Sequence, residues 1–342
     1  MKYIYARNSC LMIFMTLAGM FGLNCARAQD KWDRLVNLEG KWKFNIGDKT
    51  AWAAPSYDDS KWEEIYVPSK WEDEGFNGYN GFAWYRRSFN GTELGLKGQG
   101  VNLFLGYIDD VDEVYVNGHK VGASGSFPPK YHTSYDAFRN YYLQPSIINF
   151  TGMNVIAVRV YDAGIEGGIV SGDVGVFVNR SEMGLSINLR GMWDFRLSPG
   201  KYMKKGDQDL KLLWEVEGQG GNGWVEVPVP SYWENQGFPD HDGSAWYRKK
   251  FIVPKQFVNE DMVLLLGKID DSDKTYLNGK LVGSMIDRHD QLRIYFVKPG
   301  DFKVGENILQ VYVDDPQGAG GIYEGPVGLM RQAEFTRFMR WR

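Results

Sequence analysis

The stretch Gly81–Phe89 reads Gly-Phe-Ala-Trp-Tyr-Arg-Arg-Ser-Phe, and it returns at Gly243–Phe251 as Gly-Ser-Ala-Trp-Tyr-Arg-Lys-Lys-Phe. The sequence on either side of the two copies repeats as well. A Val-Pro-x-x-Trp-Glu element lies upstream of each copy, at Val67–Glu72 and Val229–Glu234. Downstream of each copy, a Gly-x-Ile-Asp-Asp-x-Asp run leads into Tyr-x-Asn-Gly. This internal similarity predicts one structural unit that is used twice.

Both repeats have the pattern of short β-strands. Leu38–Phe44 matches Leu189–Phe195, and in each the apolar residues fall on alternate positions, as in a strand with one buried face. Asn117–Gly118 and Asn278–Gly279 stand between apolar runs and predict two-residue hairpin turns, because both turn positions need positive φ. No stretch has the pattern of an amphipathic helix of several turns. We predict an all-β protein of two tandem antiparallel β-sandwich domains of the jelly-roll type.

The N-terminus has the pattern of a secretory signal. Lys2 and Arg7 precede the apolar segment Leu11–Leu23, which is short for a membrane span, and Ala26–Ala28 fits the small-x-small cleavage pattern. We therefore expect export to the periplasm or the extracellular space after cleavage near residue 28. Attachment as a lipoprotein through Cys25 is the alternative.

The expected organisation has four parts. Residues 1–28 form the signal peptide, residues 29–182 the first jelly roll, residues 183–332 the second, and residues 333–342 a C-terminal tail. Both cysteines of the chain lie in the signal segment, so the mature protein has no disulfide and no thiolate ligand. That segment holds three basic residues, which leaves 36 (39 − 3) against 43 acidic ones. Such a balance argues against nucleic acid as a partner, and we expect no membrane span.

The repeated motifs resemble a known family. Leu-x-Gly-x-Trp-x-Phe, Val-Pro-x-x-Trp, Trp-Tyr-Arg-(Arg/Lys)-x-Phe and Val-Tyr-Val-Asn-Gly-x-x-Val-Gly are similar to the N-terminal sugar-binding jelly roll of glycoside hydrolase family 2, which includes β-galactosidases and β-glucuronidases. The Ile-Asp-Asp-x-Asp run and the segment Asn154–Gly164 resemble the galactose-binding-like domain of sialate O-acetylesterases. The resemblance implies the fold more strongly than the function, because this module occurs beside different catalytic domains.

The catalytic parts of both families are not found in this sequence. Family 2 enzymes carry their two glutamates on a separate (β/α)₈ barrel, and the esterases need a Gly-x-Ser-Asn block and a distant Asp-x-x-His. Asn259–Glu260 resembles the acid/base pair of the barrel but falls in a polar connector between strands. The four histidines are not spaced as metal ligands. We therefore predict no catalytic residue, no cofactor and no catalysis by this chain alone.

A sugar site is expected in the loops at one end of each sandwich, where polar groups converge beside an aromatic ring. In family 2 galactosidases the Asp after the last long strand of this domain reaches toward the active-site sugar, and Asp162 and Asp315 match that place. A carboxylate suits the task because it accepts two sugar hydroxyls. The predicted carbohydrate-binding residues are Asn77, Tyr79, Asp162 and Glu166 in the first repeat and Asp240, His241, Asp242, Asp315, Tyr323 and Glu324 in the second.

Two acidic runs precede the Asn-Gly turns, and their role stays open. They consist of Asp109, Asp110 and Asp112, and of Asp270, Asp271 and Asp273. They could bind a structural Ca²⁺, cap turns, or pair with the repeated Arg86 and Arg248. The repeated tryptophans are expected in the core, because aromatic side chains dominate buried area. They are Trp71, Trp84, Trp233 and Trp246.

Three functions follow from this sequence. The first is a secreted, non-catalytic carbohydrate-binding protein whose partner is a glycan. The second is a hydrolase component of the family 2 or O-acetylesterase type, whose catalytic domain is absent from this chain or supplied by a partner chain. The third is a structural module that docks onto a partner. Exposed Trp or Tyr faces beside Asp162 or Asp315 would favour the first.

Overall fold

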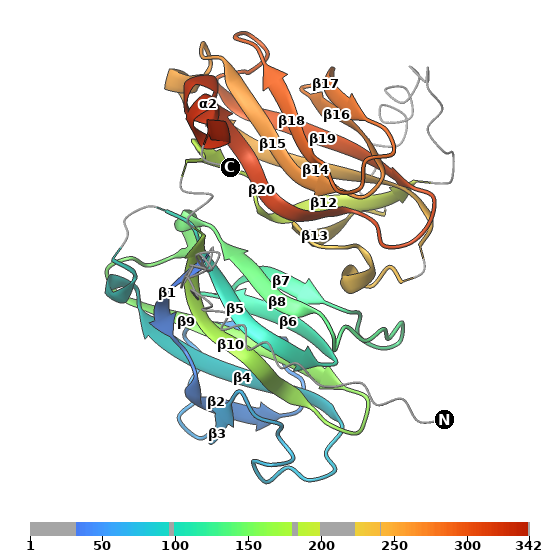
Figure 1. Cartoon of the computed structure of the whole chain (residues 1–342). Coiled ribbons are helices and arrows are strands. Elements are labelled where there is room, and N and C mark those ends of the chain that lie inside the picture. Colours follow the sequence, from blue (N-terminus) through green and yellow to red (C-terminus); the bar gives the residue numbers. More distant parts are fainter. Residues whose placement is uncertain (1–31, 96–98, 180–183, 199–222, 240, 341–342) are drawn as a thin grey trace, which may run out of the picture. The chain divides into compact units, whose positions relative to one another are not determined.

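The computed structural model describes residues 32–95, 99–179, 184–198, 223–239 and 241–340 (Figure 1). The predicted signal peptide, with Cys10 and Cys25, lies outside them, and so does Asp240. The described chain is all-β, and each of its strand ladders is antiparallel. Within the described residues, no helix is both long and apolar enough to cross a membrane.

The first half of the described chain, residues 32–179, forms two sheets. One has the order β1-β10-β5-β8 and the other the order β3-β2-β4-β9-β6-β7. The strands are β1 (Trp32–Asn37), β2 (Gly40–Ile46), β3 (Glu63–Val67), β4 (Gly81–Asn90), β5 (Val101–Asp109), β6 (Val111–Val116), β7 (His119–Ser124), β8 (Phe138–Leu143), β9 (Met153–Asp162) and β10 (Gly168–Asn179). Three short 3₁₀ helices accompany them: η1 (Thr50–Ala53), η2 (Gly91–Leu94) and η3 (Pro145–Ile147).

The second half, residues 184–340, has the same strand order. Its sheets run β11-β20-β15-β18 and β13-β12-β14-β19-β16-β17, so each strand stands where its counterpart stands in the first half. The strands are β11 (Ile187–Asn188), β12 (Gly191–Ser198), β13 (Val225–Val229), β14 (Gly243–Val253), β15 (Met262–Ile269), β16 (Ser272–Leu277), β17 (Lys280–Met285), β18 (Leu292–Val297), β19 (Gly305–Asp315) and β20 (Ile322–Arg331). The helical segments are η5 (Glu234–Gln236), η6 (Lys255–Phe257) and α2 (Gln332–Arg340).

Alternation along the strands builds a large buried core cluster in each half. In the first half, Trp42 of β2 and Val158 of β9 come from one sheet and Leu103 of β5 from the other, and all three share one cluster. In the second half, Phe195 of β12 and Leu264 of β15 do the same. Each fully buried aliphatic side chain contributes about 1.5–3 kcal/mol. The tryptophans that we expected in the core are all buried.

The Asn-Gly turns form as predicted. Asn117 and Gly118 have φ of 51° and 80° between β6 and β7, and Asn278 and Gly279 have φ of 51° and 81° between β16 and β17. Each Asn side chain also donates to the next long strand: Asn117 to the Oδ1 of Asn154 at 2.8 Å, with an equivalent bond from Asn278. The turn is therefore fixed by its backbone conformation and by a hydrogen bond from the asparagine side-chain amide.

The last Asp of each acidic run is part of a buried ion pair. The Arg139 guanidinium donates to Asp112 at 2.7 Å, and both side chains are fully buried. Arg293 donates to Asp273 in the same way at 2.9 Å. Pairing with Arg86 and Arg248 was one of the interpretations left open, and it is wrong. Arg86 points to the opposite face of its sheet, because it alternates with the core residue Tyr85, and it pairs with Asp59.

The C-terminal tail expected at residues 333–342 is largely helical. Residues Gln332–Arg340 form α2, and Phe335 packs against Val263, Leu265 and Met330 of the four-stranded sheet. The segment is short, with only two and a half turns. A periodic pattern cannot be recognised over so few residues.

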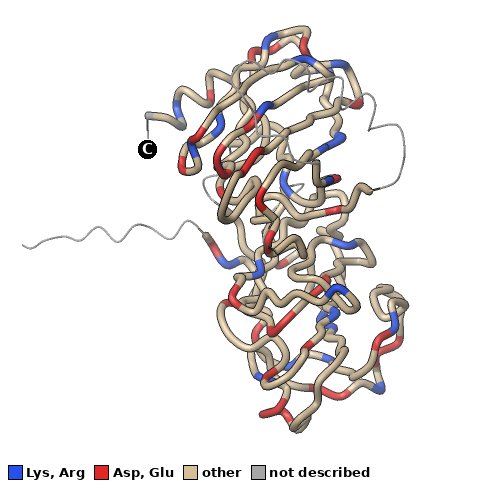
Figure 2. The backbone as a smooth tube through the Cα atoms, turned by 90° about the vertical axis from the view of Figure 1, so that its right-hand side faces the viewer, with Lys and Arg blue, Asp and Glu red and all other residues tan. Residues whose placement is uncertain are grey.

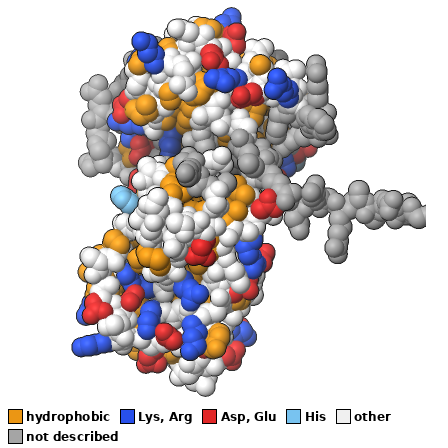
Figure 3. Space-filling model, turned by 90° about the vertical axis from the view of Figure 1, so that its left-hand side faces the viewer, with side chains coloured by type: hydrophobic (Ala, Val, Ile, Leu, Met, Phe, Trp, Pro, Cys, Tyr) orange, Lys and Arg blue, Asp and Glu red, His pale blue; other side chains and the backbone are white. Residues whose placement is uncertain are grey.

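Acidic and basic side chains are interspersed in both halves. Figure 2 shows both signs along the described backbone, and the face in Figure 3 carries them intermingled with apolar side chains.

Replacing Arg139 with Met should strongly destabilise the fold. It leaves the Asp112 carboxylate buried without its cation, which costs about 3–5 kcal/mol in such pairs. Urea unfolding of the full chain, followed by tryptophan fluorescence, measures the loss. The control is Lys250→Met, because Lys250 makes only an exposed 4.0 Å pair with Glu306 and should change stability by less than about 0.5 kcal/mol. Equal effects of the two substitutions would contradict the structural role of the buried pair.

Candidate functional site

A tryptophan, a glutamate and a glycine-rich loop pack together in each half. The loop after β9 reaches Trp71 and Glu72, whose carboxylate accepts the Gly167 N–H at 3.1 Å. A Cβ on Gly167 would lie 2.1 Å from the Trp71 ring, so only glycine fits there. The second half repeats this with Trp233, Glu234 and Gly320. The repeated motifs thus hold the predicted sugar-binding loops in place.

The two predicted carboxylates, Asp162 and Asp315, are fully buried at the start of these loops. Asp162 accepts the Gly164 N–H at 2.9 Å, and burial raises its pKa to about 6. Asp315 accepts the Gln317 N–H at 3.1 Å, and burial raises its pKa to about 7, with nearby carboxylates adding to the effect. Each carboxylate therefore shapes its own loop, and neither is open to solvent.

The second carboxylate oxygen of Asp162 and that of Asp315 have different neighbours in the two halves. When the Asn80 amide is oriented to donate, it lies 3.1 Å from Oδ2 of Asp162. Asp242 occupies the equivalent place in the second half, and it accepts the Gly318 N–H at 3.2 Å. A carboxylate cannot donate, so Oδ2 of Asp315 is buried with no partner among the described residues. Burial, with the nearby carboxylates of Asp270 and Asp271 adding to it, raises the pKa of Asp315.

The other predicted residues of the first half have mixed roles. Tyr79 packs edge-on against Trp71 at 5.7 Å and donates its hydroxyl to the Phe82 carbonyl at 2.7 Å. Glu166 pairs with Lys70 at 2.5 Å, and Asn77 is exposed on the neighbouring loop. Tyr79 is therefore a support for the loop, while Asn77 and Glu166 remain at the surface.

In the second half, His241 replaces Tyr79. Its ring lies edge-on to Trp233 at 5.3 Å, and its Nε2 is buried without a partner among the described residues. Asp240 lies outside the described residues. Tyr323 and Glu324 lie at the start of β20, and they line a cavity instead of the loop that follows Asp315.

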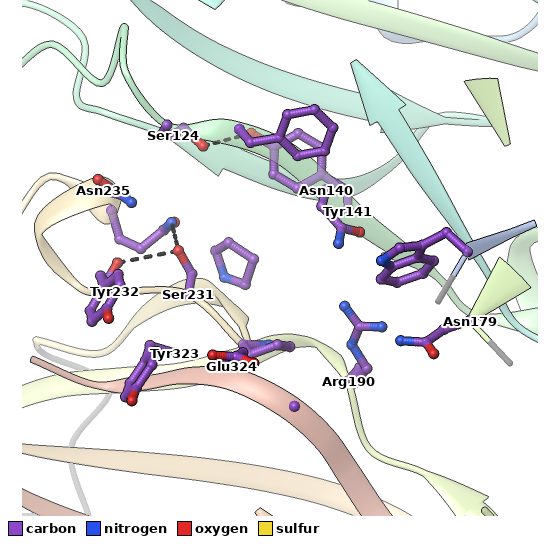
Figure 4. A pocket seen from close by; sticks show the side chains of 17 residues that line it. Ser124, Asn140, Tyr141, Asn179, Arg190, Ser231, Tyr232, Asn235, Tyr323 and Glu324 are labelled. Carbon is purple, nitrogen blue, oxygen red and sulfur yellow. Dashed lines mark hydrogen bonds between the residues drawn. The ribbon is translucent and has the colours of Figure 1, made fainter. Parts of the chain in front are cut away.

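This cavity of about 380 Å³ lies within the compact unit Lys31–Arg342 (Figure 4). Figure 4 shows Ser124, Asn140 and Tyr141 on one side and Ser231, Tyr232, Tyr323 and Glu324 on the other. The lining is mainly polar and aromatic. It comprises Trp32, Ser124, Ala137, Phe138, Asn140, Tyr141, Asn179, Arg190, Pro228, Pro230, Ser231, Tyr232, Asn235, Gln236, Tyr323, Glu324 and Gly325.

Two stacked tyrosines form one end of the cavity. The Tyr232 and Tyr323 rings are 4.6 Å apart and nearly parallel, at 7°. The Tyr323 hydroxyl donates to the His289 carbonyl at 2.8 Å, and burial raises the pKa of Tyr232 to about 12. Both rings are therefore fixed and neutral at physiological pH.

The opposite end of the cavity is cationic and amide-rich. Arg190 is almost fully buried, with its guanidinium 6.0 Å from the Trp32 ring. Figure 4 shows Asn179 and Asn140 beside it. At the tyrosine end, Glu324 is already paired with Lys268 at 3.0 Å. Amide, hydroxyl and guanidinium groups facing aromatic rings fit a small polyhydroxylated ligand, and the volume is typical of small-molecule sites.

Most of these lining residues were missed from sequence. Tyr232 is a variable position of the Val-Pro-x-x-Trp element, where the first repeat has Lys70. Such a difference between otherwise matching motifs is a signal that could have identified Tyr232. Arg190 is likewise a variable position of a repeated motif, where the first repeat has Glu39, whereas Asn140 and Asn179 stand in no quoted motif and meet the other residues only in the folded chain.

Two aspartates of the first acidic run lie close enough to Asp162 for the three carboxylates to share a metal ion. Carboxylate oxygens of Asp109, Asp110 and Asp162 all lie within 4.8 Å of one another. Burial, followed by the hydrogen bond with Asp110, raises the pKa of Asp109 to about 7. Ca²⁺ takes six to eight oxygen ligands, so one oxygen from each of these three would have to be supplemented by further carboxylate, carbonyl or water oxygens. Asp112 and Asp273 are excluded from such a site by their buried arginine partners.

Comparison with known proteins gives partial matches. A family model described as the second all-β domain of β-galactosidase matches residues 47–166. A protein of Formosa agariphila named "Putative beta-glucuronidase" is 32% identical over 147 residues, covering 38% of this chain. The match spans only 13% of that relative's length. These findings support a domain like those of glycoside hydrolase family 2 in the first half.

Solved structures share a low overall likeness. β-Glucuronidase of Bacteroides uniformis is 18% identical with a TM-score of 0.38, covering 84% of this chain and 28% of that chain. A glycosyl hydrolase family 2 member from Bacteroides cellulosilyticus is 16% identical with a TM-score of 0.35, covering 84% and 32%. β-D-Mannosidase from Dictyoglomus thermophilum is 24% identical with a TM-score of 0.28, covering 39% and 16%. Scores this low add no support for the arrangement of the sheets.

The raised pKa of Asp315 predicts a pH dependence of stability. The folded state binds this proton more tightly than the unfolded chain, whose value is 3.8. The contribution of Asp315 to the unfolding free energy therefore falls as pH rises from about 4 to about 7. Asp315→Asn removes this loss, so the stability of the variant relative to the unchanged chain should rise with pH.

Urea unfolding at steps from pH 4 to pH 8 measures this difference. Asp162→Asn is the matched comparison, and its relative gain should be complete at about pH 6. A difference between Asp315→Asn and the unchanged chain that stays constant across the range would contradict the assignment.

Proposed function

We propose that this chain is an exported, non-catalytic glycan-binding protein built from two galactose-binding-like jelly rolls. Export follows from the signal peptide expected at residues 1–28, with cleavage near Ala28. The jelly-roll assignment is supported by the identical strand order of the two halves and by the shared core of each sheet pair. We also propose that both jelly rolls are similar to the galactose-binding-like domain of sialate O-acetylesterases.

The observation that carries the proposal is the cavity of Figure 4. It combines the rigid Tyr232–Tyr323 stack with Arg190 and several amide and hydroxyl groups. Flat apolar ring faces beside converging hydrogen-bonding groups are the surroundings that a sugar needs, since a sugar has apolar C–H faces and a rim of hydroxyls. Two of the residues predicted from sequence to bind carbohydrate, Tyr323 and Glu324, line this cavity.

The comparisons favour a second candidate, a hydrolase component of the family 2 type. The matched relative is named as a β-glucuronidase, and the match spans 13% of its length. In that case the present residues would position a glycan for a catalytic domain elsewhere or on a partner chain. The two candidates differ in whether the chain turns over a substrate.

Replacing Tyr323 with Ala should weaken glycan binding by about tenfold or more. It removes one ring of the stack, and the loss of a single well-packed aromatic contact costs at least 1.4 kcal/mol, which is tenfold in affinity. A glycan array with the full chain identifies a ligand, and calorimetric titration then measures its Kd for both proteins. Tyr66→Ala is the control, because Tyr66 is an exposed tyrosine on β3 and does not line the cavity.

The same preparation is tested with chromogenic galactoside, glucuronide and acetyl-ester substrates. Hydrolysis by the chain alone would contradict the non-catalytic proposal and support the hydrolase candidate. Glycan binding that is equally strong in Tyr323→Ala would exclude the cavity as the site. Absence of any glycan binding would contradict the proposal and favour the third function, a module that docks onto a partner.

A further inference from the structure

The outer face of the six-stranded sheet in the first half carries a row of aromatic rings. Phe127 stacks on Phe82 with centroids 5.7 Å apart at 14°, Phe82 contacts Tyr161 at 4.8 Å, and Tyr161 contacts Tyr131 at 5.7 Å. All four rings keep part of their surface exposed, and Tyr131 is 39% exposed. We call these four side chains the aromatic row.

Strand alternation places the row on the side away from the core. Phe82 and Tyr161 are directly paired on β4 and β9. Their neighbours Ala83 and Val160 belong to the core cluster, so Phe82 and Tyr161 point to the other face. The row therefore lies on the outer face of the sheet, on the same side as Trp84, which packs there against Trp52 and Trp62.

The remaining two rings come from the loop between β7 and β8, residues 125–137. This loop is closed by paired backbone bonds between Ser126 and His132, at 2.9 and 3.0 Å. It is also tied to Asp110, whose carbonyl accepts the Ser134 N–H at 3.0 Å and whose carboxylate accepts the Thr133 hydroxyl. The rings are thus held in position before any ligand arrives, which lowers the entropy cost of binding.

The second half has no such row among its described residues. Ser244 and Asp314 take the places of Phe82 and Tyr161, and the Ser244 hydroxyl donates to Asp314 at 2.8 Å. The corresponding loop between β17 and β18 spans only residues 286–291. The frame is common to both halves, but the aromatic row is an addition to the first.

The charges along the row are already balanced. The Arg159 guanidinium lies 4.8 Å from the Phe82 centroid and 4.2 Å from that of Phe127. It is held by Asp48 at 2.8 and 2.5 Å and by Glu113 at 3.4 Å. An anionic ligand would therefore have to compete with two carboxylates for this cation. A neutral ligand meets no such penalty.

Hydrogen-bond acceptors stand at one end of the row. Burial and the nearby Asp110 carboxylate raise the pKa of Tyr131, and Asp109 is half-buried beside Asp110. Exposed apolar surface rimmed by polar groups marks an interaction site. Four partly exposed rings in successive contact, with the half-buried Asp109 carboxylate near one end, match consecutive sugar units of a neutral chain.

We propose that the aromatic row binds a stretch of a neutral polysaccharide, as a second site separate from the cavity. This inference rests on the proposed function, and it adds that the first half recognises several consecutive units of a chain. The cavity holds one small sugar unit, whereas the row offers several contacts along a polymer. Affinity at the row should therefore rise with the length of the oligosaccharide.

The test uses the full chain in native affinity gels that contain galactan, mannan or polygalacturonate. We expect retardation by a neutral polysaccharide and none by polygalacturonate. Oligosaccharides of one, three and six units from the retarding polymer are then titrated calorimetrically. Tyr131→Ala and Phe127→Ala should each weaken binding of the hexamer by about tenfold, which is 1.4 kcal/mol. Tyr66→Ala is the matched control and Tyr323→Ala the cavity variant, and both should retain hexamer binding at the row.

The other outcomes of this test would contradict the aromatic row as a binding site, the proposed function, or both. Hexamer binding that survives both row substitutions, or equal affinity for one and six units, overturns the inference. Retardation only by polygalacturonate also overturns it. If a glycan binds and is lost only in Tyr323→Ala, the proposed function stands and the aromatic row is excluded. If no glycan or polysaccharide binds at all, both proposals fail together.

Discussion

The ion pair between Asp112 and Arg139 is the constraint on which the first half depends. Asp112 lies on β6 and Arg139 on β8, so the pair joins the six-stranded sheet to the four-stranded sheet. Tyr141 adds a hydroxyl bond to the same carboxylate at 2.6 Å. Arg139 also donates to the carbonyls of Ser134 and Ala137 and thereby fixes the end of the loop. A single guanidinium thus sets both the joining of the sheets and the position of the aromatic row.

The same device recurs in the second half and holds a different loop. Arg293 pairs with Asp273 and donates to the carbonyls of Arg288 and Gln291, which are the residues equivalent to Ser134 and Ala137. The shared geometry lies in the frame, and the two halves differ in the side chains that the frame holds. One half presents stacked tyrosines to a cavity, and the other presents a row of rings to solvent.

The strand pattern and the turns could be predicted from sequence because they depend on local periodicity. Asn117–Gly118 and its counterpart needed only the φ preference of two residues. The arginines of the buried pairs could not be predicted from the quoted motifs. Both stand in an Arg-x-Tyr segment shared by the repeats, at residues 139–141 and 293–295, and this shared segment was the available signal. The cavity was predicted only at Tyr323 and Glu324, because its other residues meet only after folding.

The last residues of the loop between β7 and β8 make bonds that the counterpart loop also makes. Arg139 and Arg293 each bind three backbone carbonyls, the third belonging to Asp110 and Asp271. These bonds fix the C-terminal end of the loop and do not depend on the seven further residues of the longer loop (13 against 6). Such a loop is an insertion whose anchoring bonds do not depend on its length. The loop can therefore change in length and sequence while the arginine keeps its bonds to the scaffold, whereas Phe82 and Tyr161 belong to β4 and β9 and would not move with it.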